Sequence, residues 1–240
     1  MRRLHLFELG DQPWLPRALR DDLTALLAHQ LGDVYRPVVP LLSWWLGRCG
    51  CTRVVDLASG AGGPWPVLQA ALTAEGRGVD VLLTDLHPPR DGPADEGEGT
   101  LRYHPEGVDA RAVPEGLDGC RTLFTGFHHF RPEEAQAFLR EAADARVPLA
   151  VFEFTERRWG NALGMLLSPL LVWKDVASLR PRRWGRWVRT YLVPVFPAVY
   201  AWDGLVSHLR TYTVDELRAM IAAAEAPGYK WDVGQIPRPG

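Results

Sequence analysis

The stretch "VVDLASGAGGPWP", residues 54–66, decides how the fold is read. A short apolar run containing one acid is followed by small residues and glycines, and then by a tryptophan between two prolines. The apolar run predicts a buried strand, and helical spacing of apolar residues resumes after it, so the glycines fall in a strand-to-helix loop. In open α/β sheets, ligands bind beside loops at the carboxyl ends of strands. The stretch therefore predicts either a structural turn or a loop that holds a ligand.

Strand-like and helix-like segments alternate on both sides of this loop. The expected strands are 53–58, 79–86, 99–110, 121–127 and 147–155, with helices at 65–78 and 132–145. Two further helices, each ended by glycine, are expected at 16–32 and 38–50, and a helix at 213–226 precedes a last strand at 228–236. Buried strands that alternate with helices favour a mostly parallel sheet covered on both faces.

Composition narrows the class of protein. The chain has 240 residues, a formal net charge of −2 and 47% hydrophobic residues, so it is neither a basic nucleic-acid binder nor an acidic tail protein. Its three cysteines include one C-x-C pair but no second pair with metal-ligand spacing, so no metal site is predicted. No signal peptide and no apolar run long enough to span a membrane are visible, which predicts a cytoplasmic protein with reduced thiols.

The glycine pattern differs from the two common phosphate-binding loops. It reads D-x-x-x-G-x-G-G from Asp56, with Trp65 where a dinucleotide fingerprint has its third glycine, and no Gly-Lys-Ser/Thr follows. Asp85 stands at the end of the second expected strand, 25 residues after Gly60. An acid at that place bonds ribose hydroxyls in Rossmann-like sheets. Together these residues favour a loop that holds a nucleoside-containing cofactor.

With these residues, the chain resembles the class I S-adenosylmethionine-dependent methyltransferases over about residues 50–155. "VVDLASGAGG" is similar to the first motif of that family, "LLTDL" to the second, "GVDARAVP" to the segment after the third strand, and "LFTGFHHF" to the fourth. The resemblance implies a Rossmann-like three-layer α/β sandwich. The mostly parallel sheet of that family has the order 3-2-1-4-5-7-6 with an antiparallel seventh strand. This sequence is expected to depart from the family at that strand, for which no segment is recognised.

The resemblance also implies one domain, 1–240, and a set of cofactor-binding residues. Within it, 1–50 would be a helical cap, 51–156 the cofactor-binding core, 157–212 a helical insertion over the substrate, and 213–240 a last helix and strand. The cofactor-binding set is Asp56, Ala58, Gly60, Gly62, Asp85, Leu86, Asp109, Ala110, Gly126 and Phe127. Asp85 would hold the ribose, Asp109 and Ala110 the adenine, and the glycine loop the methionine portion. Asp56 either fixes the loop or faces a cationic group of the cofactor.

Two histidines are the candidates for a catalytic base. His128 and His129 follow the fourth expected strand, beside the expected position of the transferred methyl group. Histidine titrates near neutral pH and can accept a proton from an oxygen or nitrogen acceptor. The alternative is that one of them caps the next helix or bonds a loop. "GFHHF" lacks the Asn/Asp-Pro-Pro-aromatic signature of DNA amino-methyltransferases, which argues against that class.

A second polar cluster precedes the helix at 213–226. The candidate substrate-binding residues there are Trp202, Asp203, His208, Arg210 and Tyr212. Mixed polar groups in an apolar segment are typical of sites that orient a small substrate. The alternative is an internal network in which Arg210 pairs with Asp203. The N-terminal residues 7–16 are expected to fold over the active site.

Residues 157–189 hold eight basic residues and one acid, interleaved with tryptophans. We favour a lid over an apolar acceptor site; the alternatives are peripheral membrane contact through 157–200 and contact with RNA. The sequence as a whole predicts methyl transfer from S-adenosylmethionine to a small apolar or aromatic acceptor. The alternatives are a Rossmann-like protein that binds S-adenosylmethionine or a nucleoside without transfer, and a methyltransferase directed at RNA or lipid.

Overall fold

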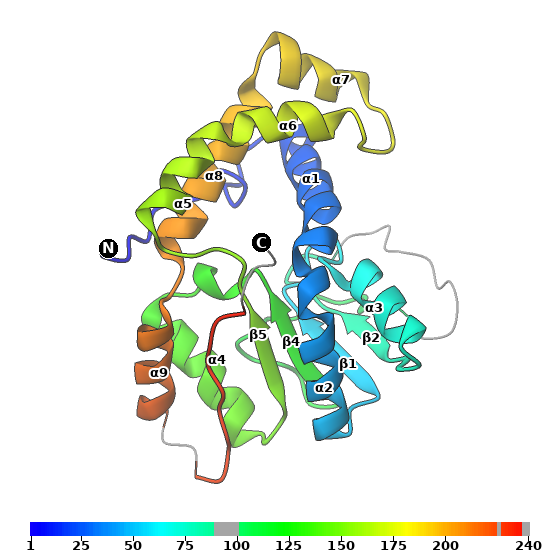
Figure 1. The fold of residues 1–240 in the computed structure, drawn as a ribbon, viewed down its shortest axis with the longest axis vertical. Helices are drawn as coiled ribbons and strands as arrows, with labels where there is room; N and C mark the ends of the chain where they lie inside the picture. The colour runs from blue at the N-terminus through cyan, green and yellow to red at the C-terminus, as the bar shows by residue number, and fades with distance from the viewer. Residues whose placement is uncertain (89–100, 225–226, 237–240) are drawn as a thin grey trace. The chain divides into compact units, whose positions relative to one another are not determined.

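The computed structural model describes residues 1–88, 101–224 and 227–236. Its contacts divide the chain into two compact units, each built from two segments (Figure 1). Unit 1 comprises Met1–Gln30 and Thr155–Thr213, and unit 2 comprises Leu31–Phe154 and Val214–Gly240. The candidate cofactor loop belongs to unit 2.

Unit 2 is built on a five-stranded sheet in which every neighbouring pair is parallel. Its strands are β1 (Arg53–Leu57), β2 (Asp80–Leu83), β3 (Leu101–Tyr103), β4 (Cys120–Phe124) and β5 (Leu149–Phe152). They lie in the order β3-β2-β1-β4-β5, with Asp56 of β1 opposite Leu83 on one side and Thr122 on the other. This confirms the fold class and the first five positions of the predicted strand order.

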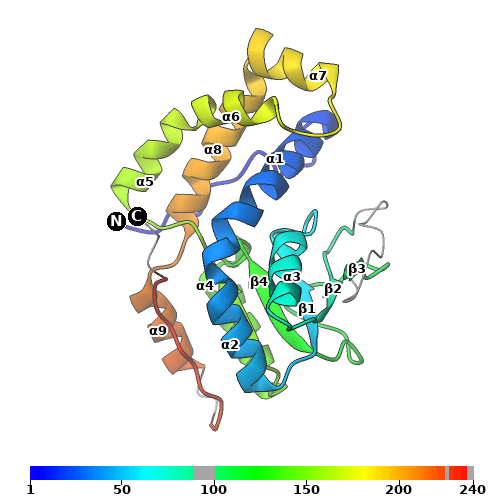
Figure 2. The same ribbon diagram turned by 45° about the vertical axis from the view of Figure 1, so that its right-hand side comes forward.

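Helices cover both faces of this sheet, as the figures show for unit 2 (Figures 1 and 2). They are α2 (Val39–Cys49), α3 (Trp65–Ala74), α4 (Pro132–Asp144) and α9 (Val214–Ala223). The crossover through α3 leads from β1 toward one edge of the sheet, and the crossover through α4 leads from β4 toward the other. Because parallel crossovers are right-handed, α3 and α4 lie on opposite faces.

The core beside the loop explains the tryptophan of the opening stretch. Trp65 is fully buried and lies in one apolar cluster with Leu46 of α2, Leu68 of α3 and Val54 of β1. Burying such side chains stabilises each by roughly 1.5–3 kcal/mol. Trp65 therefore fastens the beginning of α3 to the sheet, directly after the glycine loop.

The two glycines expected to end the first helices behave differently. Gly50 has φ +66° and caps α2, as predicted. The first helix, α1, runs Arg17–Tyr35, so the predicted end at Gly32 is wrong. A Cβ atom at position 32 would lie 2.6 Å from Val67 Cγ2. Gly32 thus serves close packing against the chain at α3 rather than helix termination.

The predicted last strand is also wrong. Residues 227–236 contain no strand. Instead, the Tyr229 hydroxyl donates to Val147 O at 2.7 Å and accepts the Leu149 N–H at 3.1 Å. These bonds fix the segment beside the beginning of β5. The residues "PRPG" lie outside the described part of the chain.

Unit 1 is helical, as predicted for the insertion after the fifth strand. Besides most of α1, it contains α5 (Trp159–Gly164), η3 (Met165–Leu167), α6 (Ser168–Val176), α7 (Trp184–Trp187), η4 (Val188–Leu192) and α8 (Val195–Arg210). Its core joins Leu23 and Leu26 of α1 to Val172 of α6 and Phe196 of α8. Residues 202–210, which lie in the predicted helical insertion, form the end of α8.

No helix among the described residues is long and apolar enough to cross a membrane. The cysteines differ from the expected reduced thiols, because Cys51 and Cys120 form a disulfide with Cα atoms 6.0 Å apart. The register pairs Val54 with Cys120, which brings Cys51, two residues before β1 begins, close to the first residue of β4. Cys49 is a free, exposed thiol.

Candidate functional site

The candidate site lies where β1 and β4 are neighbours and their following connections leave in opposite directions. Such a switch point is where ligands bind in open α/β sheets. Ala58 follows β1 with φ +53°, and Thr125 follows β4 with φ +52°. Residues other than glycine rarely adopt this left-handed conformation, and such strain gathers at functional sites. Two strained residues at adjacent strand ends therefore mark this edge of the sheet.

The loop after β1 needs its glycines. Gly60, Gly62 and Gly63 have φ values of +54°, +96° and +52°. A Cβ atom at position 62 would lie 3.4 Å from the Tyr103 hydroxyl, whereas one at position 60 would have no described residue other than its chain neighbours within 4 Å. Ala58 and Gly60 are exposed. The glycines thus permit the turn and present its backbone at the surface.

Asp56 sits beneath the loop and is 1% exposed. Its carboxylate accepts hydrogen bonds from the Ser59 hydroxyl at 2.6 Å and from the Thr122 hydroxyl at 2.6 Å. Burial raises the pKa of Asp56 to about 6, although both hydroxyls act to lower it. These contacts favour the first of the two roles expected for Asp56, fixing the loop from below.

We predict that Asp56 makes stability depend on pH. Its pKa is about 6 in the folded protein and near 3.8 in an unfolded chain. The folded protein therefore binds this proton more tightly, so the stabilisation is fully present below about pH 4 and is lost as the pH rises through about 6. Over that range, ionisation of Asp56 should lower the free energy of unfolding of the wild type by about 3 kcal/mol, and Asp56→Asn should not show this decrease. Urea unfolding of both proteins across the range measures the difference; parallel pH profiles would contradict it.

Asp85 follows β2 and contacts the glycine loop. One carboxylate oxygen accepts the Gly60 N–H at 2.9 Å, and the other accepts the His87 N–H at 2.9 Å. The Tyr103 hydroxyl donates to Gly60 O at 2.9 Å. Burial raises the pKa of Tyr103, and the nearby carboxylates raise it further, so the hydroxyl stays a neutral donor. Sequence reasoning missed Tyr103, which lay inside the expected strand 99–110; in the structure it is the last residue of β3.

The segment expected to contact adenine is brought beside Asp85. The Val108 N–H donates to Asp85 O at 2.9 Å, so residues 108–110 lie at the end of β2. Ala110 is buried, and Leu86 is exposed. The Asp109 carboxylate pairs with Arg111 at 2.7 Å, and Arg111 also pairs with Glu134 at 2.7 Å. The hydrogen bond from Arg111 lowers the pKa of Asp109, so this acid is ionised and already engaged.

The residues after β4 complete the edge. A Cβ atom at Gly126 would lie 3.7 Å from the Ala58 Cβ, so the β1 and β4 loops are in contact. The Phe127 ring packs against Phe130 and Phe138. Its N–H donates to Glu153 Oε1 at 2.7 Å. The structure thus brings Gly126 to the candidate loop, while the ring of Phe127 lies in the core beside α4.

His128 is paired with an acid that sequence reasoning missed. It lies in η2 (Phe127–His129), is 2% exposed, and its Nδ1 lies 3.0 Å from Glu153 Oε2. Although burial acts to raise the pKa of Glu153, the charge and hydrogen bonds of His128 lower it below its ordinary value. The His129 ring lies 4.4 Å from that of His128. The one signal for Glu153 was an acid inside the apolar run of the expected strand 147–155.

The candidate substrate residues belong to unit 1, where they hold the N-terminal segment. Asp203 accepts the Leu9 N–H at 2.6 Å and the Gly10 N–H at 2.8 Å. Arg210 pairs with Glu8 at 3.1 Å, not with Asp203 as the alternative interpretation had it. That interpretation rested on the proximity of Asp203 and Arg210 along the chain. In the structure, both side chains instead find their partners in residues 6–10.

The other three candidates make similar contacts within unit 1. The Trp202 indole donates to Phe7 O at 3.1 Å. His208 Nδ1 lies 2.9 Å from Glu156 O. The Arg3 guanidinium lies 4.0 Å from the centre of the Tyr212 ring. These interactions tie residues 3–10 and 156 to the end of α8, and a direct role toward a substrate stays a prediction.

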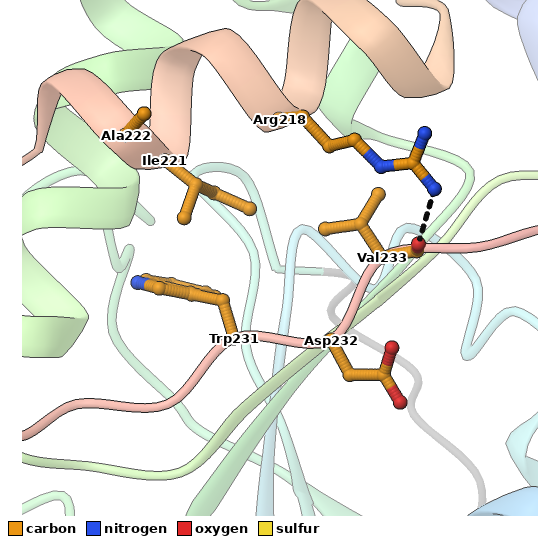
Figure 3. A pocket seen from close by; sticks show the side chains of 6 residues that line it. All are labelled: Arg218, Ile221, Ala222, Trp231, Asp232 and Val233. Atoms are coloured by element: carbon orange, nitrogen blue, oxygen red, sulfur yellow. Dashed lines mark hydrogen bonds between the residues drawn. The ribbon is translucent and has the colours of Figure 1, made fainter.

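A separate hollow of about 360 Å³ lies between α9 and the C-terminal segment (Figure 3). It is lined by Arg218, Ile221, Ala222, Trp231, Asp232 and Val233. Arg218 donates to Val233 O at 3.4 Å across it. None of the predicted site residues lines this hollow.

Comparison with known proteins gives distant likenesses only. No family model matches the chain, and no curated protein matches it. The plantazolicin methyltransferase BpumL, solved in complex with SAH, aligns with a TM-score of 0.48 and 11% identity over 91% of this chain and 72% of its own. TnmH aligns with a TM-score of 0.46 and 23% identity, over 65% of this chain and 46% of its own.

The plantazolicin methyltransferase BamL, solved in complex with a triazolic desmethylPZN analog and SAH, aligns with a TM-score of 0.45 and 10% identity. That alignment covers 89% of this chain and 77% of BamL. Similarities this distant do not establish an activity for this chain. The strands and crossovers of unit 2 establish its architecture directly: the chain has a Rossmann-like α/β fold with parallel strands in the order 3-2-1-4-5.

Proposed function

We propose that this chain transfers a methyl group from S-adenosylmethionine to a small apolar or aromatic acceptor. The observation that carries the proposal is the cluster at the ends of β1 and β2, where the exposed Gly60 is bonded to Asp85 and Tyr103. The ordered resemblance of the four strand-end motifs supports the identity of the cofactor. The cytoplasmic location inferred from the sequence stays a prediction.

The donor and acceptor groups at this edge fit the cofactor. Each Asp85 oxygen accepts one N–H, and a carboxylate has lone pairs for further donors. Two ribose hydroxyls can therefore donate to Asp85 without breaking its present bonds. No described residue other than its chain neighbours lies within 4 Å of a Cβ atom placed at Gly60, so within the described part of the chain a ligand can approach the loop backbone there. Trp65 is buried in the core and leaves that approach open.

When bound, S-adenosylmethionine supplies an electrophilic methyl group for an S_N2 step. The chain contributes orientation, which can be worth several kcal/mol. Where the acceptor is a hydroxyl or protonated amine, His128 would accept its proton. Glu153, held ionised, would orient the ring through Nδ1 and stabilise the imidazolium that forms.

The proposal predicts that Asp85→Ala weakens binding of S-adenosylmethionine by about 10- to 100-fold. Hydrogen bonds to a charged group contribute roughly 1.5–3 kcal/mol, which corresponds to that range. Calorimetric titration of the two proteins measures the change. The matched control is Asp33→Ala, which removes an exposed acid whose partner is Arg36 on the surface. Equal affinity for wild type and Asp85→Ala would show that Asp85 does not contact the cofactor.

Cofactor binding without transfer is the competing function. Release of S-adenosylhomocysteine separates the two, measured with a panel of quinols, polyphenols and lipids as acceptors. Turnover with an aromatic or apolar acceptor supports transfer to a small molecule. An RNA-directed enzyme would instead bind RNA with an affinity that falls steeply with salt.

A further inference from the structure

Unit 1 exposes one continuous apolar strip along α5, η3 and α6. On the inward side, Ala162, Val172 and Val176 are buried. On the outward side, six large apolar side chains are each between 53% and 67% exposed: Trp159, Leu163, Leu166, Leu167, Leu170 and Leu171. We call these six the apolar strip. Their spacing of three and four residues places them on one side of a helical run.

The exposed apolar surface continues onto η4. The Trp173 indole donates to Thr190 O at 3.2 Å, and the Tyr191 hydroxyl donates to Trp173 O at 2.5 Å, which fixes η4 against α6. Leu192 and Val193 beside them are exposed. Residues 159–195 contribute 12 of the 23 large apolar side chains recorded as exposed in the described part of the chain. Concentration of this kind marks an interaction surface rather than scattered surface residues.

One side of this run is already occupied within unit 1. Figures 1 and 2 both show α5 and α6, coloured lime, lying along the orange helix α8. A Cβ atom at Gly204 of α8 would collide with Met165 Cε, so α8 and the run are in close contact. The apolar strip is on the side that α8 does not cover.

Exposed cations lie beside the strip, although several of the basic residues there are buried or paired. Arg157 is buried, Arg158 pairs with Glu156, Arg183 pairs with Asp21, and Arg186 and Arg189 pair with Asp22. Residues 157–189 contain eight basic residues and one acid. That acid, Asp175, accepts a hydrogen bond from Gln30 at 2.8 Å. Lys174, Arg180 and Arg182 are exposed, and Arg158 stands exposed at the beginning of α5. A partner for this surface must therefore accept apolar side chains, and negative charge on the partner would complement the exposed Lys174, Arg180 and Arg182.

We propose that the apolar strip docks on the surface of an anionic lipid bilayer. Leucines would enter the boundary of headgroups and acyl chains, exposed tryptophans would lie at the interface, and the cations would contact lipid phosphates. A second copy of the chain would bring the same cations face to face, and RNA would leave the leucines without an apolar partner. The contact does not depend on the enzymatic activity proposed above.

Vesicle co-sedimentation of the full chain tests this surface. We expect binding to vesicles of equimolar phosphatidylcholine and phosphatidylglycerol to exceed binding to pure phosphatidylcholine by about tenfold or more, because each cation near the surface favours binding. The excess should fall as salt is raised. Leu166→Gln with Leu170→Gln should abolish binding to both vesicles while leaving the circular dichroism spectrum unchanged.

The matched control is Leu41→Gln with Trp44→Gln, which removes two exposed apolar side chains of α2 in unit 2. It should bind anionic vesicles as the wild type does. Equal loss in both double variants, or no binding by the wild type, would overturn the proposal. So would a wild-type dimer in sedimentation that the strip variant converts to a monomer without any vesicle binding.

Discussion

Replacing His128 by glutamine is expected to lower the rate of methyl transfer by about 10²- to 10⁴-fold, the usual contribution of a positioned general base. The expectation follows from the contact between His128 Nδ1 and Glu153 at 3.0 Å, which directs the other ring nitrogen to proton transfer. The measurement is release of S-adenosylhomocysteine with an acceptor on which the wild type turns over. Affinity for S-adenosylmethionine should stay the same.

Two further variants separate catalysis from structure. His129→Gln should retain most of the activity, because Glu153 contacts His128 through both its ring and its backbone N–H. Glu153→Gln should move the rising limb of the pH–rate profile to lower pH, since the imidazolium loses its neighbouring negative charge. Wild-type turnover in His128→Gln would exclude this histidine as the base.

Replacing Asp22 by alanine is expected to lower the free energy of unfolding by about 3–5 kcal/mol, the usual result of removing one partner from a buried ion pair. Asp22 is fully buried in α1 and accepts hydrogen bonds from Arg186 at 2.9 Å and from Arg189 at 2.6 Å. Arg186 is itself 2% exposed. The variant would leave this guanidinium buried without its carboxylate. Urea unfolding followed by circular dichroism measures the loss.

The neighbouring acid supplies the control. Asp21 pairs with Arg183 at 3.3 Å, and both side chains are about half exposed. Asp21→Ala should therefore change the free energy of unfolding by less than about 1 kcal/mol. Similar losses in the two variants would show that the buried pair contributes no more than an exposed one.

The sheet could be predicted because its signals are local. Apolar runs marked β1, β2, β4 and β5, and helical spacing marked α3 and α4. The weaker third strand, expected over 99–110, is reduced to Leu101–Tyr103. The right-handed crossover rule then limits how such strands can be ordered. The predicted helix end at Gly32 was wrong because a helix can need glycine for packing as well as for termination. The sequence does not show that Val67 lies opposite Gly32.

The site could be predicted only in part because its contacts span distant residues. The glycine loop and Asp85 were recognisable from strand ends, and the structure joins them through the Gly60 N–H. Tyr103 and Glu153 carried no motif, and their contacts depend on the spatial order of strands. Arg210 does not pair with Asp203, the nearby acid in the sequence. Its partner is Glu8, about 200 residues earlier.

The central claim is that the loop after β1 holds S-adenosylmethionine. Calorimetric titration of the wild type with S-adenosylhomocysteine tests it most directly, because this product needs no acceptor and undergoes no reaction. One saturable site is expected, with affinity reduced in Asp85→Ala and with no comparable binding of a dinucleotide. Absence of binding by both S-adenosylhomocysteine and S-adenosylmethionine would contradict the account.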